Sequence, residues 1–474
     1  MPVDRDAVLD SAKYLRGVRP VDPGELREYV EGQPREAVVR QVLREHAADL
    51  GLVEREDGTF EPASDEPVRP AFDGVDRLPD RYEHAVEDLL VRRWGANWHR
   101  GDSGDELRAT IRRFKDDYYR RNPVEYDDDV ALGYAVYHLA VYYAAVQYVL
   151  DDLARGGRLP GDLRVLDLGA GVGGPALGLF DFLPGDALVE YHAVEPSAAA
   201  DVLDVLLGET GRNVHPTVHR ETAEGFDPDG EYDLVLACSV LSELDDPVAV
   251  VDRYLDALAE DGTLLALAPA DKHTSTTLRD VERAVECPPG TDPDAGDCAT
   301  VYGPTPRLWP DERPADRGWT FDERPELEAP AFQRRLAEAS ERPSEFRHTE
   351  VRFSYSLLRR DGAREHEVEL SGDRLLKLAN ADDWVTKRAD LVAAKLSPNL
   401  ADEDANPLFK VSDGSEDTDC YAVLVRETGL NRDLLDAGYG DLLSVESALV
   451  LWNDDEDAYN LVVDEETVVD RIPG

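Results

Sequence analysis

Short apolar segments alternate with helical patterns through the middle of the chain. The apolar segments lie near residues 164, 190, 233 and 264, and stretches with helical periodicity separate them. Strands that alternate with helices in this way form a parallel, doubly wound sheet, so the pattern predicts an α/β domain. A later apolar segment, Arg352–Arg359, is expected to add one more strand to the same sheet.

The patterns on either side of this domain predict different structures. Residues 22–63 favour two helices, the second at 35–50, and then a hairpin with an Asp57-Gly58 turn, an order typical of a winged-helix module. Residues 80–158 favour helices. Beyond a polar stretch at 397–407, short alternating strands at 420–425, 441–451 and 459–463 predict a small β-barrel.

The apolar stretch at 130–150 is about long enough to span a bilayer. It contains His138, Gln147 and five tyrosines, and acids flank both of its ends. We therefore expect a buried helix and no association with a membrane. The first thirteen residues hold no apolar core segment, so we also expect no signal peptide and a cytoplasmic protein.

An acid and a run of glycines follow the first strand of the predicted sheet, in Arg164-Val-Leu-Asp-Leu-Gly-Ala-Gly-Val-Gly-Gly174. Glycines at 169, 171 and 173 let the backbone turn tightly and approach a ligand without a Cβ in the way. Glycines at 169, 171 and 174 also satisfy the dinucleotide pattern G-x-G-x-x-G. The spacing alone therefore allows either a dinucleotide or S-adenosylmethionine.

Three further features favour S-adenosylmethionine, a methyl donor. Asp167 stands two residues before the first glycine, where S-adenosylmethionine enzymes resemble one another in placing an acid near the cationic end of the ligand. Glu195 ends the next strand, where a carboxylate can accept both ribose hydroxyls. The segment at 231–240 resembles the fourth strand of such enzymes. The residues we expect to bind the cofactor are Asp167, Gly169, Gly171, Gly173, Glu195 and Ser239.

These features together predict an α/β fold with a class I Rossmann-like S-adenosylmethionine methyltransferase sheet. We expect a winged-helix-like module at 1–66, a helical domain at 67–158, the Rossmann-like domain at 159–400 and the small β-barrel at 401–474. A segment rich in proline, glycine and aspartate is expected to form an irregular insertion at about 287–324.

No residue can be assigned a catalytic role from the sequence. Enzymes that methylate amino groups of bases usually carry Asn or Asp, two prolines and an aromatic residue after the fourth strand, and this chain has Ser239-Val-Leu-Ser-Glu243 there. Cytosine C5 enzymes need a thiolate, but Cys238 lies inside an apolar strand and is expected to be a small buried residue.

The charge of the chain changes its expected surroundings. There are 51 basic and 101 acidic residues, a net charge of −50 that is spread along the whole length. An acidic surface keeps a protein soluble in molar salt, where the Debye length of roughly 3 Å hides charges from one another. We therefore expect a halophilic archaeal protein, with an acidic protein of an ordinary cytoplasm as the alternative.

Residues 91–121 depart from this acidic background, with nine Arg or Lys and five acids, and five aromatic residues lie among them. Arginine planes and aromatic faces bind RNA outside duplexes. The alternative is an amphipathic helix whose aromatic side chains belong to the core. The residues we expect to bind RNA are Arg112, Arg113, Lys115, Arg120 and Arg121.

Five segments resemble one family, the small-ribosomal-subunit methyltransferase-like (Rsm-type) proteins, which include mitochondrial ribosome assembly factors and bacterial and archaeal relatives. The segments are the tyrosine-rich helix at 131–150, the loop at 165–173, Leu241-Ser-Glu-Leu244, Phe353-Ser-Tyr355 and Tyr439-Gly-Asp-Leu-Leu443. The resemblance covers most of residues 130–450. It implies that the partner is the small ribosomal subunit or its RNA during assembly, with S-adenosylmethionine as ligand.

The resemblance also implies an iron–sulfur cluster, because the family holds one with cysteines of the insertion and one near the barrel. The matching residues here are Cys287, Cys298 and Cys420. The chain departs from the family by lacking a third cysteine in a tight cluster in the insertion. The spacing of the four cysteines includes no C-x-x-C, so without the resemblance it is weak evidence for a metal. We expect no disulfides, because the protein is expected to be cytoplasmic.

Three functions remain open from the sequence, and the oligomeric state remains open with them. The first is an S-adenosylmethionine-dependent methyltransferase that acts on small-subunit ribosomal RNA. The second is an assembly factor that binds the donor and the RNA but transfers no methyl group. The third is a small-molecule methyltransferase, for which the winged-helix-like module and the arginine-rich stretch would have no obvious use.

Overall fold

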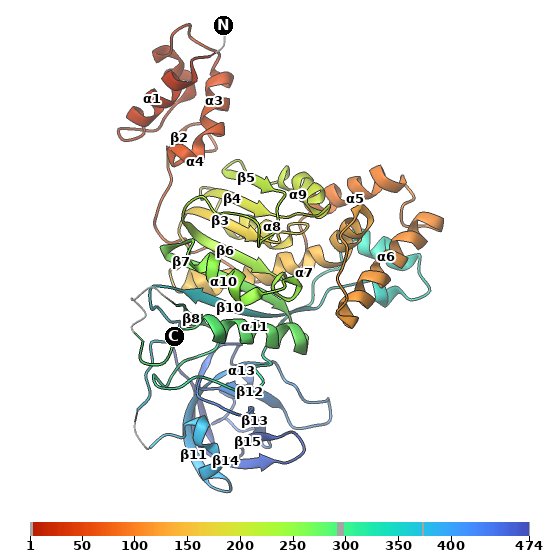
Figure 1. Ribbon diagram of the computed structural model, residues 1–474, viewed down its shortest axis with the longest axis vertical. Coiled ribbons are helices and arrows are strands. Elements are labelled where there is room, and N and C mark those ends of the chain that lie inside the picture. Colours follow the sequence, from red (N-terminus) through yellow and green to blue (C-terminus); the bar gives the residue numbers. More distant parts are fainter. Residues whose placement is uncertain (1–2, 292–297, 372–373, 474) are drawn as a thin grey trace. The chain divides into compact units, whose positions relative to one another are not determined.

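The computed structural model describes residues 3–291, 298–371 and 374–473 (Figure 1). The chain divides into two compact units. The first unit consists of residues 1–234 and 326–351, and the second of residues 235–325 and 352–474. The expected insertion at 287–324 lies in the second unit, and its residues 292–297 lie outside the described residues.

The first unit begins with a small helical module that ends in a hairpin. Its elements are α1 (Arg5–Leu15), α2 (Pro23–Leu26), η1 (Arg27–Tyr29), α3 (Glu36–Glu45), α4 (Ala47–Leu50), β1 (Leu52–Glu54) and β2 (Phe60–Pro62). The predicted hairpin is confirmed, with β1 and β2 antiparallel. The helix predicted at 35–50 is broken at His46, whose φ of −122° and ψ of 19° lie outside the helical region. Buried Val8, Leu43 and Phe60 form part of the core.

Three helices follow in the same unit, as the patterns predicted. They are α5 (Asp80–Trp94), α6 (Gly101–Arg120) and α7 (Asp128–Arg155). The side chain of Asp127 caps α7, and most of this helix is buried. It packs closely on α8 (Gly174–Phe182), since a Cβ added at Gly178 would lie 2.4 Å from the carbonyl oxygen of Tyr143. Among the described residues no helix is both long enough and apolar enough to cross a membrane.

The first unit also contains a parallel sheet. Its strands β3 (Asp162–Leu168), β4 (Leu188–Val194) and β5 (Val214–His219) stand in the order β5-β4-β3, and α9 (Ala199–Leu207) follows β4. The strands predicted near 164 and 190 are confirmed. The segment α12 (Ala331–Glu338) and η4 (Pro343–Phe346) returns to this unit, where Gln333 Nε2 donates to the carbonyl oxygen of Val136 at 2.9 Å.

The second unit contains further strands of mixed direction. They stand in the order β6-β7-β10-β8, and β9 pairs with β10. The strands are β6 (Tyr232–Cys238), β7 (Leu258–Pro269), β8 (Thr300–Gly303), β9 (Asp322–Arg324) and β10 (Val351–Arg359). The predicted late strand is therefore confirmed, and it runs antiparallel to β7. The helical elements here are η2 (Leu241–Glu243), α10 (Pro247–Leu255) and α11 (Lys272–Val285).

The predicted small β-barrel is present in the second unit. Its strands are β11 (Arg388–Lys395), β12 (Leu408–Ser412), β13 (Cys420–Leu424), β14 (Leu442–Asn453), β15 (Ala458–Val463) and β16 (Val468–Arg471), with η5 (Leu378–Trp384) before them and α13 (Asp433–Asp436) between β13 and β14. The order β11-β12-β13-β15-β14 closes because β14 also pairs with β11, and β16 adds to β14. Buried apolar side chains, among them Leu391, Val411 and Leu461, fill the interior.

A buried cation fastens the insertion to the barrel within the second unit. Lys410 on β12 is 1% exposed, and its Nζ donates to Asp316 and, at 2.7 Å, to Asp419. Arg283 also pairs with Asp316, and Arg317 with Asp419. Burial opposes the charge on Lys410, but the two carboxylates outweigh it and raise the pKa of the lysine. The ammonium group therefore stays charged in the interior.

Replacing Lys410 by Met should destabilise the second unit by about 3 kcal/mol, because two buried carboxylates lose a shared cation. Urea unfolding at constant salt measures this loss. The matched control is Lys387→Met, at an exposed lysine of the same barrel. Equal stabilities of the two variants would contradict the structural role of Lys410.

Candidate functional site

The loop after β3 requires glycine at three positions. Gly169, Gly171 and Gly173 have φ of +62°, +55° and +89°, a region that side chains with a Cβ rarely adopt. Gly173 is also the residue before the first turn of α8, and a Cβ there would lie 2.5 Å from Cδ1 of Leu203. The sequence therefore forms a tight turn that presents backbone N–H groups at the start of a helix, an arrangement that favours ligand groups with negative charge.

The end of β4 holds this loop in place. The N–H of Gly169 donates to the carbonyl oxygen of Val194 at 2.9 Å. The N–H of Gly171 donates to Oε2 of Glu195 at 2.9 Å, and Oε1 of the same carboxylate accepts from the N–H of Ser197 at 2.9 Å. The structure thus brings together the predicted residues Gly169, Gly171 and Glu195. Glu195 is 6% exposed and lies where β4 ends.

Asp167 has one satisfied and one unsatisfied oxygen. It is 1% exposed, its Oδ2 accepts from the hydroxyl of Tyr191 at 2.7 Å, and its Oδ1 is buried without a hydrogen-bond partner. Burial raises the pKa of this carboxyl to about 7; the Tyr191 hydrogen bond opposes the rise, and the charge of Glu195 adds to it. A buried acceptor without a partner is costly, so a cationic ligand group at Oδ1 would stabilise the ionised form.

These residues fit S-adenosylmethionine on the geometry of the first unit. Asp167 offers an unpaired oxygen to an ammonium group, and a carboxylate with two accepted hydrogen bonds, as in Glu195, keeps lone pairs for ribose hydroxyls. Gly171 leaves the space beside its backbone open, since a Cβ there would meet only the Gly169 carbonyl oxygen, at 3.9 Å.

Ser239 belongs to the second unit and directly follows β6. Its φ is +60°, an uncommon conformation for a residue other than glycine. The N–H of Ser239 donates to the carbonyl oxygen of Leu267 at 2.6 Å, and its Oγ is buried without a partner. Strained residues of this kind cluster at ligand sites, which is consistent with the role that the sequence predicted for Ser239.

Four of the five residues predicted to bind RNA line one open hollow of about 600 Å³ in the first unit. Its lining consists of Ala109, Arg112, Arg113, Lys115, Asp116, Asp117, Arg120, Arg342 and Glu345. Arg121 does not line it and instead ends α6 with a left-handed φ of 59°. The arginines are paired: Glu345 accepts from both Arg112, at 2.7 Å, and Arg342, at 3.0 Å.

Some aromatic residues of 91–121 belong to the core, and others are accessible to a ligand. Trp98, in the turn between α5 and α6, is fully buried, and Phe114 of α6 is 4% exposed, so both belong to the core. Tyr118 and Tyr119 are 43% and 87% exposed on the last turn of α6. Basic side chains therefore line the hollow, and two accessible aromatic rings lie on the last turn of the same helix.

A cluster of aromatic and histidine side chains centred on His138 of α7 was not predicted from the sequence. The ring of His138 lies 4.5 Å from that of Tyr134 and 5.3 Å from that of Tyr142, measured between centroids, and 5.0 Å from that of His348. Residues 134, 138 and 142 are four apart, so they share one face of a helix. This spacing of four residues is the feature of the sequence from which the cluster could have been predicted.

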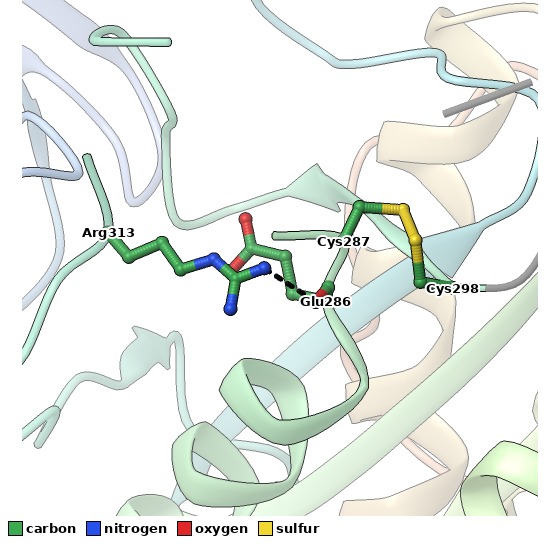
Figure 2. The surroundings of a disulfide bond; sticks show 4 residues. All are labelled: Glu286, Cys287, Cys298 and Arg313. Atoms are coloured by element: carbon green, nitrogen blue, oxygen red, sulfur yellow. Dashed lines mark hydrogen bonds between the residues drawn. A yellow bond between two sulfur atoms is a disulfide. The ribbon is translucent and has the colours of Figure 1, made fainter. Parts of the chain in front are cut away.

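The cysteines differ from the expected metal ligands. Cys287 and Cys298 form a disulfide bond, so the expectation of no disulfide is wrong, and two of the three expected cluster ligands are not thiolates (Figure 2). Residues 286 and 299 pair as a short bridge, which brings the two cysteines together. Cys420 is fully buried in the barrel, and burial raises the pKa of its thiol. Within the described part of the chain, no group of three His, Cys, Asp or Glu residues could hold a metal ion.

Comparisons with known proteins identify three parts of the chain. Residues 166–264 match the family model of a methyltransferase domain. Residues 5–56 match the N-terminal domain, and residues 379–472 the C-terminal domain, of a domain of unknown function, DUF8157. None of the curated proteins compared with the chain matches it.

Several solved structures of methyltransferases are similar to parts of the chain. An S-adenosylmethionine-dependent methyltransferase from Clostridium acetobutylicum is 15% identical over 28% of this chain and 51% of its own, with a TM-score of 0.23. The CcbJ methyltransferase from Streptomyces caelestis is 24% identical over 27% and 49%, with a TM-score of 0.21. The chain thus spans about half of each. The plantazolicin methyltransferase BpumL in complex with SAH is 13% identical over 59% and 98%, with a TM-score of 0.30.

The number of reactive thiols tests whether Cys287 and Cys298 form a disulfide. The protein unfolded without reductant should react with a thiol reagent at two sulfurs, Cys238 and Cys420, and at all four after reduction. Mass spectrometry of the alkylated peptides identifies them. Four reactive thiols before reduction, together with visible iron–sulfur absorbance after anaerobic purification, would contradict the disulfide and support an iron–sulfur cluster.

The raised pKa of Asp167 predicts how ligand affinity depends on pH. Below about pH 7 the carboxyl is protonated and cannot pair with an ammonium group, so S-adenosylhomocysteine should bind roughly tenfold more tightly at pH 8 than at pH 6. Asp167→Asn should bind it more weakly at pH 8 and lose this pH dependence. Calorimetric titration measures both.

The same substitution should raise the unfolding temperature of the ligand-free protein at pH 8. Because folding raises the pKa of this carboxyl, the folded protein becomes less stable as the pH rises from about 4 to 7. Asn carries no charge, so it avoids the cost of burying one. Asp186→Asn, at an exposed acid of the same unit, is the control and should change neither property. An Asp167→Asn variant with unchanged affinity would remove this residue from the site.

Proposed function

We propose that the protein is an S-adenosylmethionine-dependent enzyme that methylates the RNA of the small ribosomal subunit during assembly. Residues 166–264 match the family model of a methyltransferase domain, which supports the reaction. The net charge of −50 supports a halophilic archaeal cytoplasm as its location, a compartment in which the Cys287–Cys298 disulfide is unusual. The observation that carries the choice of acceptor is the open hollow lined by Arg112, Arg113, Lys115 and Arg120 in a chain whose net charge is −50. The ordered resemblance of five segments to Rsm-type proteins supports the same acceptor.

The loop after β3 supports the binding of the methyl donor. When bound, S-adenosylmethionine supplies a methyl group on a positively charged sulfur, which an acceptor can attack without covalent help from the protein. Asp167 would pair with the ammonium group of the donor through its unsatisfied Oδ1. Glu195, fixed by the N–H groups of Gly171 and Ser197, would accept from the ribose hydroxyls. At the donor, these residues would therefore contribute position and exclusion of water.

The acceptor half rests on the hollow beside α6. Its ion pairs are exposed; the side chains of Arg112 and Arg120 are 52% and 68% accessible, and such pairs contribute only about 0–1 kcal/mol. A phosphate can therefore replace a carboxylate partner at small cost. In molar salt phosphate contacts alone bind weakly, so stacking on aromatic side chains such as Tyr119 must add to them.

The experiment compares ribosomal RNA from a strain lacking the gene with RNA from its parent. We expect one methylated nucleoside to disappear from the small-subunit RNA, as measured by mass spectrometry. Purified protein should transfer tritiated methyl groups from S-adenosylmethionine to small subunits isolated from the deletion strain, and the double variant Arg113→Gln/Arg120→Gln should do so at least about tenfold more slowly. The matched control is Arg426→Gln, which removes an exposed, paired arginine of the barrel.

Two outcomes would show that the protein does not have this function. If every methyl mark persists while immature small subunits accumulate, the protein is an assembly factor that binds the donor without using it. If neither the marks nor the assembly of small subunits change, the small subunit is not the partner, and a small molecule becomes the acceptor to test.

A further inference from the structure

His138 has a buried ring nitrogen that the protein does not satisfy. Its Nδ1 is inaccessible and has no hydrogen-bond partner, while the side chain as a whole remains partly accessible. Burial lowers the pKa of His138 well below its ordinary value, and the charges of His348 and Lys115 lower it further. The imidazole is therefore neutral at neutral pH, the form that can accept a proton.

Flat rings from three segments of the first unit surround this histidine. Tyr134 and Tyr142 come from α7, Phe114 comes from α6 with its ring 5.9 Å away, and His348 comes from the segment after η4. The ring of Tyr142 is nearly parallel to that of His138, at an interplanar angle of 7°. Such a cluster offers stacking surfaces to a flat acceptor, and every nucleobase has a flat face that can use them.

The cluster adjoins the loop that we assign to the methyl donor. At the start of α8, a Cβ added at Gly174 would lie 3.0 Å from Cβ of Tyr142 and 3.1 Å from the carbonyl oxygen of Leu139. After β4, the N–H of Ala198 donates to the carbonyl oxygen of Tyr126 at 3.3 Å. The ring of Tyr126 in turn lies 5.7 Å from that of Tyr134. The aromatic cluster therefore contacts both segments that flank the donor site, the start of α8 and the turn after Glu195.

The cluster also adjoins the basic hollow. Lys115 lines the hollow, and its Nζ donates to the hydroxyl of Tyr137 at 2.7 Å and lies 4.2 Å from the centre of that ring. Tyr137 stacks on His348 at 4.7 Å, and the Nδ1 of His348 lies 3.2 Å from the carbonyl oxygen of Tyr137. Basic side chains, stacked rings and the donor loop thus follow one another along α6 and α7.

We propose that the cluster around His138 holds the nucleobase that accepts the methyl group, and that His138 takes the proton which that base loses. This inference rests on the proposed function and adds the acceptor subsite to it. Phosphates of the strand lie in the basic hollow, while one unpaired base leaves its stack and enters the cluster, as enzymes that modify bases require.

The chemical step balances with the groups named. The electron pair of a nitrogen of the base attacks the methyl carbon, and a new bond between that nitrogen and the carbon forms. The bond between that carbon and sulfur breaks, its electron pair stays on sulfur, and neutral S-adenosylhomocysteine leaves. The proton of the acceptor passes to a ring nitrogen of His138 and then to water. No oxidant or reductant takes part.

The binding test uses single-stranded RNA hexamers with one fluorescent base at the centre, either 2-aminopurine or pyrrolocytosine. The wild-type protein saturated with S-adenosylhomocysteine should bind a hexamer and quench at least one of the two bases, because stacking on aromatic rings quenches both. Tyr134→Leu should weaken binding about tenfold and remove most of the quenching. The matched control is Tyr14→Leu, which changes an exposed tyrosine of the N-terminal module and should leave both properties unchanged.

The proton test separates packing from chemistry at His138. His138→Phe keeps a flat ring between the tyrosines and removes both nitrogens, so it should keep the quenching within about twofold. Transfer of methyl groups to small subunits should fall at least about a hundredfold, as for loss of a general base. Calorimetric binding of S-adenosylhomocysteine at wild-type strength shows that each variant is folded.

The outcomes distinguish this inference from the proposed function. If the wild-type protein methylates the RNA and binds the hexamers without quenching either base, the acceptor lies elsewhere and only the inference fails. Full transfer by His138→Phe would overturn the role of the histidine. If the wild-type protein neither binds the hexamers nor methylates small subunits, the proposed function fails and the inference fails with it.

Discussion

The site that we assign to the methyl donor depends on one clamp between the end of β4 and the loop after β3. Three left-handed glycines shape the loop, and the carbonyl oxygen of Val194 and the carboxylate of Glu195 accept its N–H groups. Without these hydrogen bonds the loop would lose the conformation that presents its backbone at the start of α8. The same clamp fixes Glu195 and places the turn at Ala198 against Tyr126, so the donor loop and the aromatic cluster are positioned together.

The interior shows how a strongly acidic chain uses its few basic residues. With 51 basic against 101 acidic side chains, several of the bases are buried as partners of carboxylates. Lys410 joins Asp316 and Asp419, and Arg307, 5% exposed, pairs with Glu282 and Glu286 at 3.1 and 2.7 Å. A buried pair stabilises little over an apolar core, but losing one partner costs several kcal/mol. These pairs therefore favour a single arrangement of the insertion, against the barrel through Lys410 and against the end of α11 through Arg307.

Periodicity predicted those elements whose burial follows the sequence pattern. The strands at β3, β4, β6, β7 and β10 and the long helix α7 are apolar over most of their length, so their patterns identified them. Strand β5 was missed because Val214-His-Pro-Thr-Val-His219 is polar, contains a proline and is only partly buried. The disulfide between Cys287 and Cys298 was missed because it depends on the pairing of residues 286 and 299, which no local pattern encodes. The importance of His138 depends on rings from α6 and from residue 348, far apart in the sequence.

Titration calorimetry with S-adenosylhomocysteine in molar potassium chloride measures whether the clamped glycine loop is the binding site of the methyl donor. We predict that the wild-type protein binds one equivalent, and that Glu195→Gln, which keeps the size of the side chain but weakens the acceptor for Gly171 and for ribose hydroxyls, binds at least about tenfold more weakly. A folded wild-type protein that gives no heat of binding, or a Glu195→Gln variant with unchanged affinity, would show that this loop is not the donor site.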